Sequence, residues 1–125
     1  MNPTTPEEYF DDSPLGRDIC EHMRRLLADR WPDVSLRTTK SQVAFRRGRS
    51  FAFLWKPGMY LRHPAAEVVV SIALPDRLAS DRFKEVVHPS EGTWMHHLEV
   101  HTVKDVDQEV DAWLLAAADA AGAAR

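Results

Sequence analysis

The chain has 125 residues, of which 44% are hydrophobic and 28% are charged, and its formal net charge is −3 at pH 7. A chain of this length can bury one core without disulfides or bound metal, and no apolar run approaches the roughly 20 residues that cross a bilayer. Its one cysteine excludes an internal disulfide, and its acidic, proline-containing start lacks the features of a secretory signal. We therefore expect a cytoplasmic protein with no membrane partner, in which residues 1–14 form a flexible arm and residues 15–122 a single α+β domain.

The first predicted element is an amphipathic helix over residues 15–31. Ser13 is a preferred N-cap residue, Pro14 suits the first helical position, and Pro32 ends the pattern. Apolar residues recur at the i, i+4, i+7, i+8 and i+12 spacing of one helix face: Ile19, Met23, Leu26, Leu27 and Trp31.

The hydrophobic period then changes to the two-residue period of strands. The sequence around Gly48, "RRGRS", is typical of a tight hairpin and predicts an antiparallel pair on either side of it. Residues 76–92 fit either a short helix or another strand, and the sequence does not decide between them. The five predicted strands are Val34–Thr39, Gln42–Arg47, Phe51–Lys56, Glu67–Leu74 and Trp94–His101.

A second amphipathic helix closes the chain. Thr102 and Asp105 stand three residues apart as in a capping box, with Asp in place of the usual Glu. We predict an α+β fold with a single, mostly antiparallel five-stranded sheet and with the N- and C-terminal helices packed on one face. The inward stripe of the last helix is formed by Val106, Val110, Trp113, Leu114 and Ala117.

Strand alternation divides the side chains between a face that the helices cover and an uncovered face. The aromatic residues of the third strand, Phe51, Phe53 and Trp55, are expected to face the core. The uncovered face then carries small residues that leave a shallow floor, bordered by long polar side chains. Its predicted members are Gln42, Ala44 and Arg46, then Ala52, Leu54 and Lys56, then Val69, Ser71 and Ala73, and finally His97 and Glu99.

Three histidines and a glutamate lie close together in "MHHLEVH", residues 95–101. Alternation places His96 toward the core, where its imidazole needs a hydrogen-bond partner. It places His97, Glu99 and His101 on the uncovered face, about 7 Å apart in succession along one strand, which is too far for all three to hold a single ion. The sequence therefore predicts no metal site and no cofactor.

Positive charge is concentrated in the middle of the chain, where residues 34–66 contain no Asp or Glu. Such a segment attracts anions, but the acidic balance of the whole chain argues against a protein that binds a nucleic acid duplex by charge alone. The predicted partners are an anionic small molecule or the phosphates of a nucleic acid. The basic residues of this segment are Arg37, Lys40, Arg46, Arg47, Arg49, Lys56 and Arg62.

Four stretches resemble a bacterial family of small domains, domain of unknown function 5655. They are "TKSQVAFRRGRSFAFLWKP" from residue 39, "DRFKEVV" from residue 81, "MHHLEV" from residue 95 and "DVDQEVDAWLLAA" from residue 105. The likeness covers residues 15–120 and implies an architecture and a site, without a reaction. The family's marked positions correspond to Thr39, Lys40, Ser41, Gln42, Phe45, Arg82, Lys84, Glu85, His96 and His97.

The main hypothesis is a binding module that holds an anionic ligand on a basic sheet face. An alternative is a small enzyme in which His97 is the general acid or base, Glu99 orients it and Ser41 is the nucleophile. Another is a homodimer that buries the face of Val69–Ala73. The ligand-binding residues are expected to converge on one pocket, with Arg82 included through the resemblance alone: Lys40, Ser41, Gln42, Arg46, Arg82 and His97.

Overall fold

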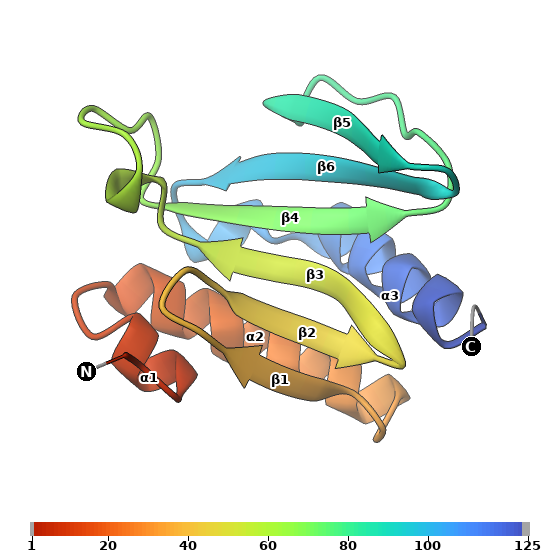
Figure 1. Cartoon of the computed structure of the whole chain (residues 1–125), viewed down its shortest axis with the longest axis horizontal. Helices are drawn as coiled ribbons and strands as arrows, with labels where there is room; N and C mark the ends of the chain where they lie inside the picture. The colour runs from red at the N-terminus through yellow and green to blue at the C-terminus, as the bar shows by residue number, and fades with distance from the viewer. Residues whose placement is uncertain (1, 124–125) are drawn as a thin grey trace.

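The computed structural model describes residues 2–123 and shows one antiparallel sheet with two long helices behind it (Figure 1). The strand order is β1-β2-β3-β4-β6-β5. The predicted α+β fold with a single antiparallel sheet is confirmed, but the sheet has six strands and not five. The additional strand, β5, lies in the stretch that the sequence left open. The strands are β1 (Ser35–Thr38), β2 (Val43–Arg47), β3 (Arg49–Trp55), β4 (Val68–Leu74), β5 (Glu85–Ser90) and β6 (Thr93–Val100).

The helices begin where the sequence supplies caps. In α2 (Pro14–Arg30) the hydroxyl of Ser13 accepts a hydrogen bond from the backbone N–H of Gly16 at 3.0 Å. The predicted capping box of Thr102 and Asp105 is present, but it caps the short 3₁₀ helix η2 (Val103–Asp105) rather than the last α-helix, α3 (Gln108–Ala123). A second 3₁₀ helix, η1 (Pro57–Met59), follows β3.

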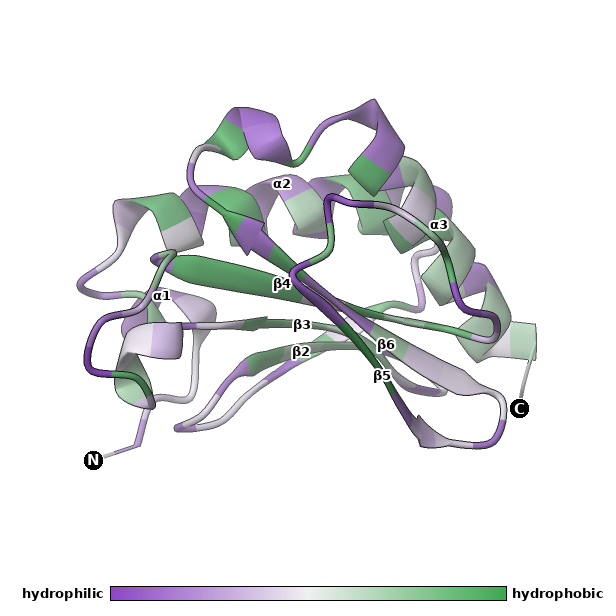
Figure 2. Ribbon diagram, turned by 90° about the horizontal axis from the view of Figure 1, so that it is seen from above, coloured by the Kyte–Doolittle hydropathy of each residue, from purple (hydrophilic) through white to green (hydrophobic). Residues whose placement is uncertain are grey.

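The core lies between one face of the sheet and the two long helices. Figure 2 shows α2 and α3 on the same side of the sheet, with the opposite side uncovered. The helices therefore determine which strand residues are buried, and the uncovered face remains available for a ligand. The largest core side chains include Phe45, Leu54 and Ile72 from the strands, Met23 and Leu27 from α2, and Leu114 from α3.

The N-terminal segment contains a four-residue helix, α1 (Pro6–Tyr9), followed by two buried aromatic residues. Tyr9 and Phe10 are only 3% and 0% exposed and belong to the core cluster. The Phe10 ring occupies the space that a Cβ at Gly16 would need, so glycine at this position lets the segment pack directly on α2. The two rings anchor the segment to the domain.

A β-bulge changes the predicted faces of β3. The pairing of β2 with β3 shifts by one residue, so that Phe45 stands opposite Ala52 while Arg46 stands opposite Ser50, and Phe51 is the extra residue. Phe51 and Ala52 are consequently both buried in the core. The prediction that Phe53 and Trp55 face the core is therefore wrong, because alternation restarts one residue later. Ala52 and Leu54, which were assigned to the uncovered face, are core residues, and Phe53 and Trp55 take their place.

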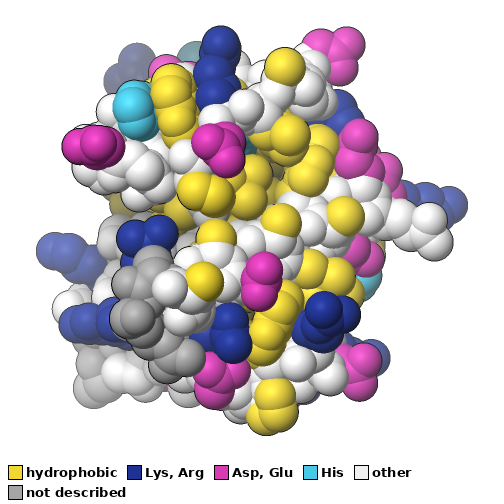
Figure 3. Space-filling model, turned by 90° about the vertical axis from the view of Figure 1, so that its right-hand side faces the viewer, with side chains coloured by type: hydrophobic (Ala, Val, Ile, Leu, Met, Phe, Trp, Pro, Cys, Tyr) yellow, Lys and Arg dark blue, Asp and Glu magenta, His cyan; other side chains and the backbone are white. Residues whose placement is uncertain are grey.

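The end of the molecule where α3 finishes shows a band of hydrophobic side chains surrounded by charged ones (Figure 3). A hollow there has a volume of about 70 Å³ and includes Phe51, Leu74 and Ala121 in its walls. This space is well below the roughly 300 Å³ at which small-molecule sites begin. Within residues 2–123, no helix is long and apolar enough to cross a membrane.

Candidate functional site

The uncovered face carries a hollow of about 430 Å³ that is built by three strands, β3, β4 and β6, and by two connections. This volume falls in the range of small-molecule sites. Figure 1 views the sheet from this side, and the β1–β2 turn and the β3–β4 loop both lie at its left-hand end. Four of the lining side chains are aromatic or apolar and four are polar. The lining residues are Ser41, Gln42, Phe53, Trp55, Tyr60, Ser71, Met95 and His97.

A chain of hydrogen bonds crosses the floor of this hollow from β3 to β6. The indole Nε1–H of Trp55 donates to Ser71 Oγ at 2.8 Å, and Ser71 Oγ lies 2.7 Å from His97 Nδ1. Ser71 is only 2% exposed, and no other acceptor for its hydroxyl proton lies within residues 2–123. The hydroxyl must therefore donate to Nδ1, which leaves the ring proton of the neutral imidazole on Nε2.

The Nε2–H group of His97 is an unused donor at the hollow. The Nε2 atom has no hydrogen-bond partner among the described residues. Every buried polar side-chain atom of those residues does have a partner, so the unpartnered Nε2 must be open to solvent. Burial lowers the pKa of His97 below its ordinary value, against the opposing effect of the Glu85 carboxylate, and His96 lowers it further. The imidazole is therefore neutral at pH 7 and presents a fixed N–H group.

We expect the stability of the protein to fall as the pH drops below about 6.5, in part because of His97. The folded state holds this imidazole neutral while the unfolded chain takes up a proton at the ordinary pKa, so acid favours unfolding. Denaturant unfolding at about pH 7.5 and about pH 5.5 should show a smaller loss for His97→Gln than for the native chain. Equal losses in the two proteins would contradict the buried, neutral state of His97.

The β1–β2 turn presents Ser41 and Gln42 to the hollow. Two tyrosine hydroxyls contact this turn at the Ser41 carbonyl. The Tyr9 hydroxyl donates to the Ser41 carbonyl at 3.0 Å, and the Tyr60 hydroxyl lies 3.5 Å from the same oxygen. Within the turn, Thr39 Oγ1 accepts from the backbone N–H of Ser41 at 3.3 Å. This bond takes the backbone N–H of Ser41, so that N–H is not available to a ligand.

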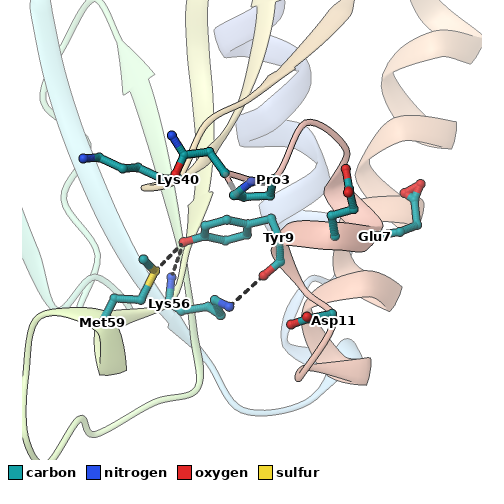
Figure 4. A pocket seen from close by; sticks show the side chains of 9 residues that line it. Pro3, Glu7, Tyr9, Asp11, Lys40, Lys56 and Met59 are labelled. Atoms are coloured by element: carbon teal, nitrogen blue, oxygen red, sulfur yellow. Dashed lines mark hydrogen bonds between the residues drawn. The ribbon is translucent and has the colours of Figure 1, made fainter.

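Lys40 lies on the same turn but belongs to a second hollow, of about 540 Å³, between the turn and α1 (Figure 4). Tyr9 stands in the middle of this second hollow. The ammonium of Lys56 donates to the Tyr9 carbonyl at 2.7 Å and pairs with Asp12 at 3.0 Å, which neutralises it. The exposed ammonium of Lys40 makes no such bond within the described residues. It is a free cation at the boundary between the two hollows.

Two arginines border the first hollow on the β1–β2 side. Arg37 stands opposite Ala44, which stands opposite Phe53, so Arg37 lies two strand spacings, about 10 Å, from the floor. Arg46 lies on the same face, two residues beyond Ala44. Neither arginine has an ion pair or side-chain hydrogen bond within residues 2–123. However, β3 and β4 separate Arg46 from His97, and neither arginine lines the hollow itself.

Arg82 lies elsewhere, at the start of α3. Its guanidinium donates to the Asp107 carboxylate at 3.0 Å, to Glu109 at 2.8 Å and to the Asp105 carbonyl at 2.8 Å. It also stacks on the Trp113 ring at 5.7 Å. These bonds tie the β4–β5 loop to α3. Of the six residues predicted to converge, the structure gathers Ser41, Gln42 and His97, sets Lys40 and Arg46 at the margins, and places Arg82 apart.

The comparison with known proteins agrees with the likeness of the four sequence stretches. Residues 7–120 match the family described as Domain of unknown function (DUF5655). The chain belongs to the DUF5655 family. No curated protein and no solved structure gives a significant match. Membership confirms the suspected family and leaves the function to be inferred from the site.

The positions that the resemblance singled out separate into two groups in this structure. His96 is 0% exposed, accepts from the Leu78 N–H at 2.9 Å and lies 3.2 Å from the Ile72 carbonyl, so its role is structural, as alternation predicted. Phe45 and Arg82 are structural as well. The other group surrounds the hollow or its rim: Thr39, Lys40, Ser41, Gln42, Lys84, Glu85 and His97.

Several residues that line the first hollow were not predicted from the sequence to be part of a site. Phe53 and Trp55 were assigned to the wrong face, and Ser71, the one hydroxyl within "VVVSIAL", was counted as a small floor residue. Ser71 is the residue that orients His97, whereas Glu99 pairs with Lys84 at 3.5 Å. Within residues 2–123, no group of three His, Cys, Asp or Glu side chains is placed to hold a metal ion.

Proposed function

We propose that this DUF5655 domain is a binding module that holds an anionic ligand on the uncovered sheet face. The observation that carries the proposal is the set of unpaired cations, Arg37, Lys40 and Arg46, beside a hollow with a free N–H donor. Unpaired cations beside a concave site attract anions, and guanidinium groups bind phosphates through two parallel hydrogen bonds.

The pattern of ion pairs supports a ligand role for these cations. In the acid-free segment, Arg47 pairs with Asp33 at 3.1 Å and Lys56 pairs with Asp12 at 3.0 Å. Both paired side chains contact the body of the protein, and both partners lie outside the acid-free segment. Arg37, Lys40 and Arg46 of the same segment have no such partner within the described residues, which leaves their charge for a ligand.

The charge on the uncovered face is graded, which gives the ligand a direction. Arg37 and Glu85 stand at opposite ends of one row that runs across the sheet through Phe53, Ser71 and His97. An anionic group is favoured near β1 and β2 and disfavoured near β5. The uncharged part of the ligand would therefore lie over β3, β4 and β6.

Titration with inorganic pyrophosphate tests this proposal. We expect measurable binding that weakens as salt rises, because the contacts are between exposed charges. The triple variant Arg37→Gln, Lys40→Gln, Arg46→Gln should bind about tenfold more weakly, since each exposed ion pair contributes about 0.2–1 kcal/mol and about 1.4 kcal/mol is a factor of ten.

A control with the same loss of charge is Arg49→Gln, Arg77→Gln, Lys104→Gln, because Arg49 lies beside α3 and the other two residues lie outside the strands. Its affinity for pyrophosphate should change much less than that of the first triple variant. No binding to the native chain, or equal losses in the two triple variants, would overturn the proposal. A second copy of the chain on the same face would appear as a dimer in light scattering.

A further inference from the structure

We infer that the ligand carries a planar aromatic ring as well as its anionic group, and that a nucleotide unit has the matching chemistry. The ring would lie in the hollow over Phe53 and Trp55, and the phosphates would reach Arg37 and Lys40. The inference deepens the proposed anion site and rests on it. A nucleotide unit can come from a free nucleotide or from a single strand of nucleic acid.

The floor of the hollow is suited to a flat, uncharged ring. Trp55 stands opposite Val69, yet its indole nitrogen reaches Ser71, two residues along β4. The indole therefore lies across the sheet instead of standing away from it. Val69 is only 4% exposed although no helix covers this face, which agrees with an indole lying over it. Phe53 and Met95 extend this apolar floor, and nucleobases stack on such surfaces.

Tyr60 provides a second ring at the mouth of the hollow. It is 59% exposed, which is high for an aromatic side chain in a folded domain. Its position is nevertheless defined, because its ring lies 6.0 Å from the Trp55 ring at an angle of 65° and its hydroxyl is 3.5 Å from the Ser41 carbonyl. An exposed ring held at the edge of an aromatic floor can cover a ligand ring from the side.

Polar groups at the edge of this floor match the edge of a nucleobase. The Nε2–H of His97 is a fixed donor, because Ser71 occupies the other ring nitrogen. The amide of Gln42 offers both a donor and an acceptor and makes no side-chain hydrogen bond within residues 2–123. A purely apolar ligand would leave these groups unpaired, whereas a heterocycle with nitrogen and oxygen at its edge would satisfy them.

The position of the cations agrees with the dimensions of a nucleotide. Arg37 stands in the same row as Phe53 at about 10 Å, with only the methyl side chain of Ala44 between them. A ring over Phe53 would thus direct its phosphates across Ala44 toward β1. The acidic Glu85 lies at the opposite end of the row and disfavours the reverse orientation.

Calorimetric titration with ADP, pyrophosphate and a short single-stranded oligoadenylate tests the inference. ADP should bind the native chain about tenfold or more tightly than pyrophosphate, since stacking on one aromatic side chain supplies roughly that factor. In Tyr60→Ala the ratio of ADP affinity to pyrophosphate affinity should fall toward one, whereas Tyr60→Phe should keep the native ratio. The matched control is Leu61→Ala, because Leu61 is the neighbouring residue and is similarly exposed at 55%.

The outcomes separate this inference from the proposed anion site. If pyrophosphate binds and ADP binds no more tightly, the inference of an aromatic ring in the ligand is overturned and the proposed anion site stands. If neither binds, both are overturned. Equal losses of ADP affinity in Tyr60→Ala and Leu61→Ala would also overturn the inference of an aromatic ring in the ligand. Oligoadenylate that binds more tightly than ADP, with the same dependence on Tyr60, identifies a single strand as the source, and weaker binding identifies the free nucleotide.

Discussion

Replacement of the buried histidine, His96→Ala, is expected to lower the free energy of unfolding by about 3 to 5 kcal/mol. The imidazole is 0% exposed, and its ring packs 4.9 Å from that of Phe83. Alanine would leave a cavity and would also leave the N–H of Leu78 without its acceptor. Few single substitutions combine a cavity with a lost buried hydrogen bond, so the effect should be among the largest in the chain.

Denaturant unfolding of His96→Ala measures this cost, and His101→Ala is the matched control because it removes an exposed imidazole just after the same strand. The control should change stability by no more than about 0.5 kcal/mol. Amide hydrogen exchange at Leu78 should accelerate in His96→Ala more than exchange in α2. A loss below about 1 kcal/mol would show that the imidazole does not support the β4–β5 loop.

Tyr9→Ala is expected to cost a similar amount, about 3 to 5 kcal/mol, and also to weaken the ligand site. The phenol is 3% exposed, packs 4.8 Å from the Phe10 ring and lies under the Lys56 ammonium at 4.7 Å. Its hydroxyl donates to the Ser41 carbonyl and accepts from the Lys56 N–H at 3.1 Å. The substitution therefore removes both a core ring and the contact that fixes the β1–β2 turn.

Tyr9→Phe separates these two effects, because it keeps the ring and removes only the hydroxyl. We expect it to cost about 1 to 3 kcal/mol, since it leaves the Lys56 N–H without an acceptor. At a temperature where Tyr9→Phe remains folded, its affinity for pyrophosphate or ADP should still fall. An affinity equal to that of the native chain would show that the turn holds its shape without Tyr9.

The two long helices could be predicted from the sequence because their signals are local. The apolar stripe and the Ser13–Pro14 start are contained within a few turns of the chain, and α2 differs from its prediction by one residue at each end. The strand β5 was harder, because it is an exposed edge strand whose "EVVHPS" carries a proline and few apolar residues. Its pairing with β6 depends on tertiary contacts that the sequence does not display.

The site could be predicted only in part, because one bulge inverts half of a strand. Counting from Phe51 gave the correct face for that residue and the wrong face for Phe53 and Trp55 beyond it. The charge of the basic segment was visible in the sequence, but which cations remain unpaired was not. That distinction depends on partners outside the segment, such as Asp12 for Lys56 and Asp33 for Arg47.

The most direct test of the ligand site is a map of backbone amide shifts as ADP is added to the isotope-labelled protein. Binding on the uncovered face predicts the largest shifts at residues 39–42 in the β1–β2 turn, at Phe53 and Trp55, and at His97. Amides of α2 and α3, on the other side of the sheet, should change little. The largest shifts on those helices, or no shifts at any residue, would contradict a ligand site on the uncovered face.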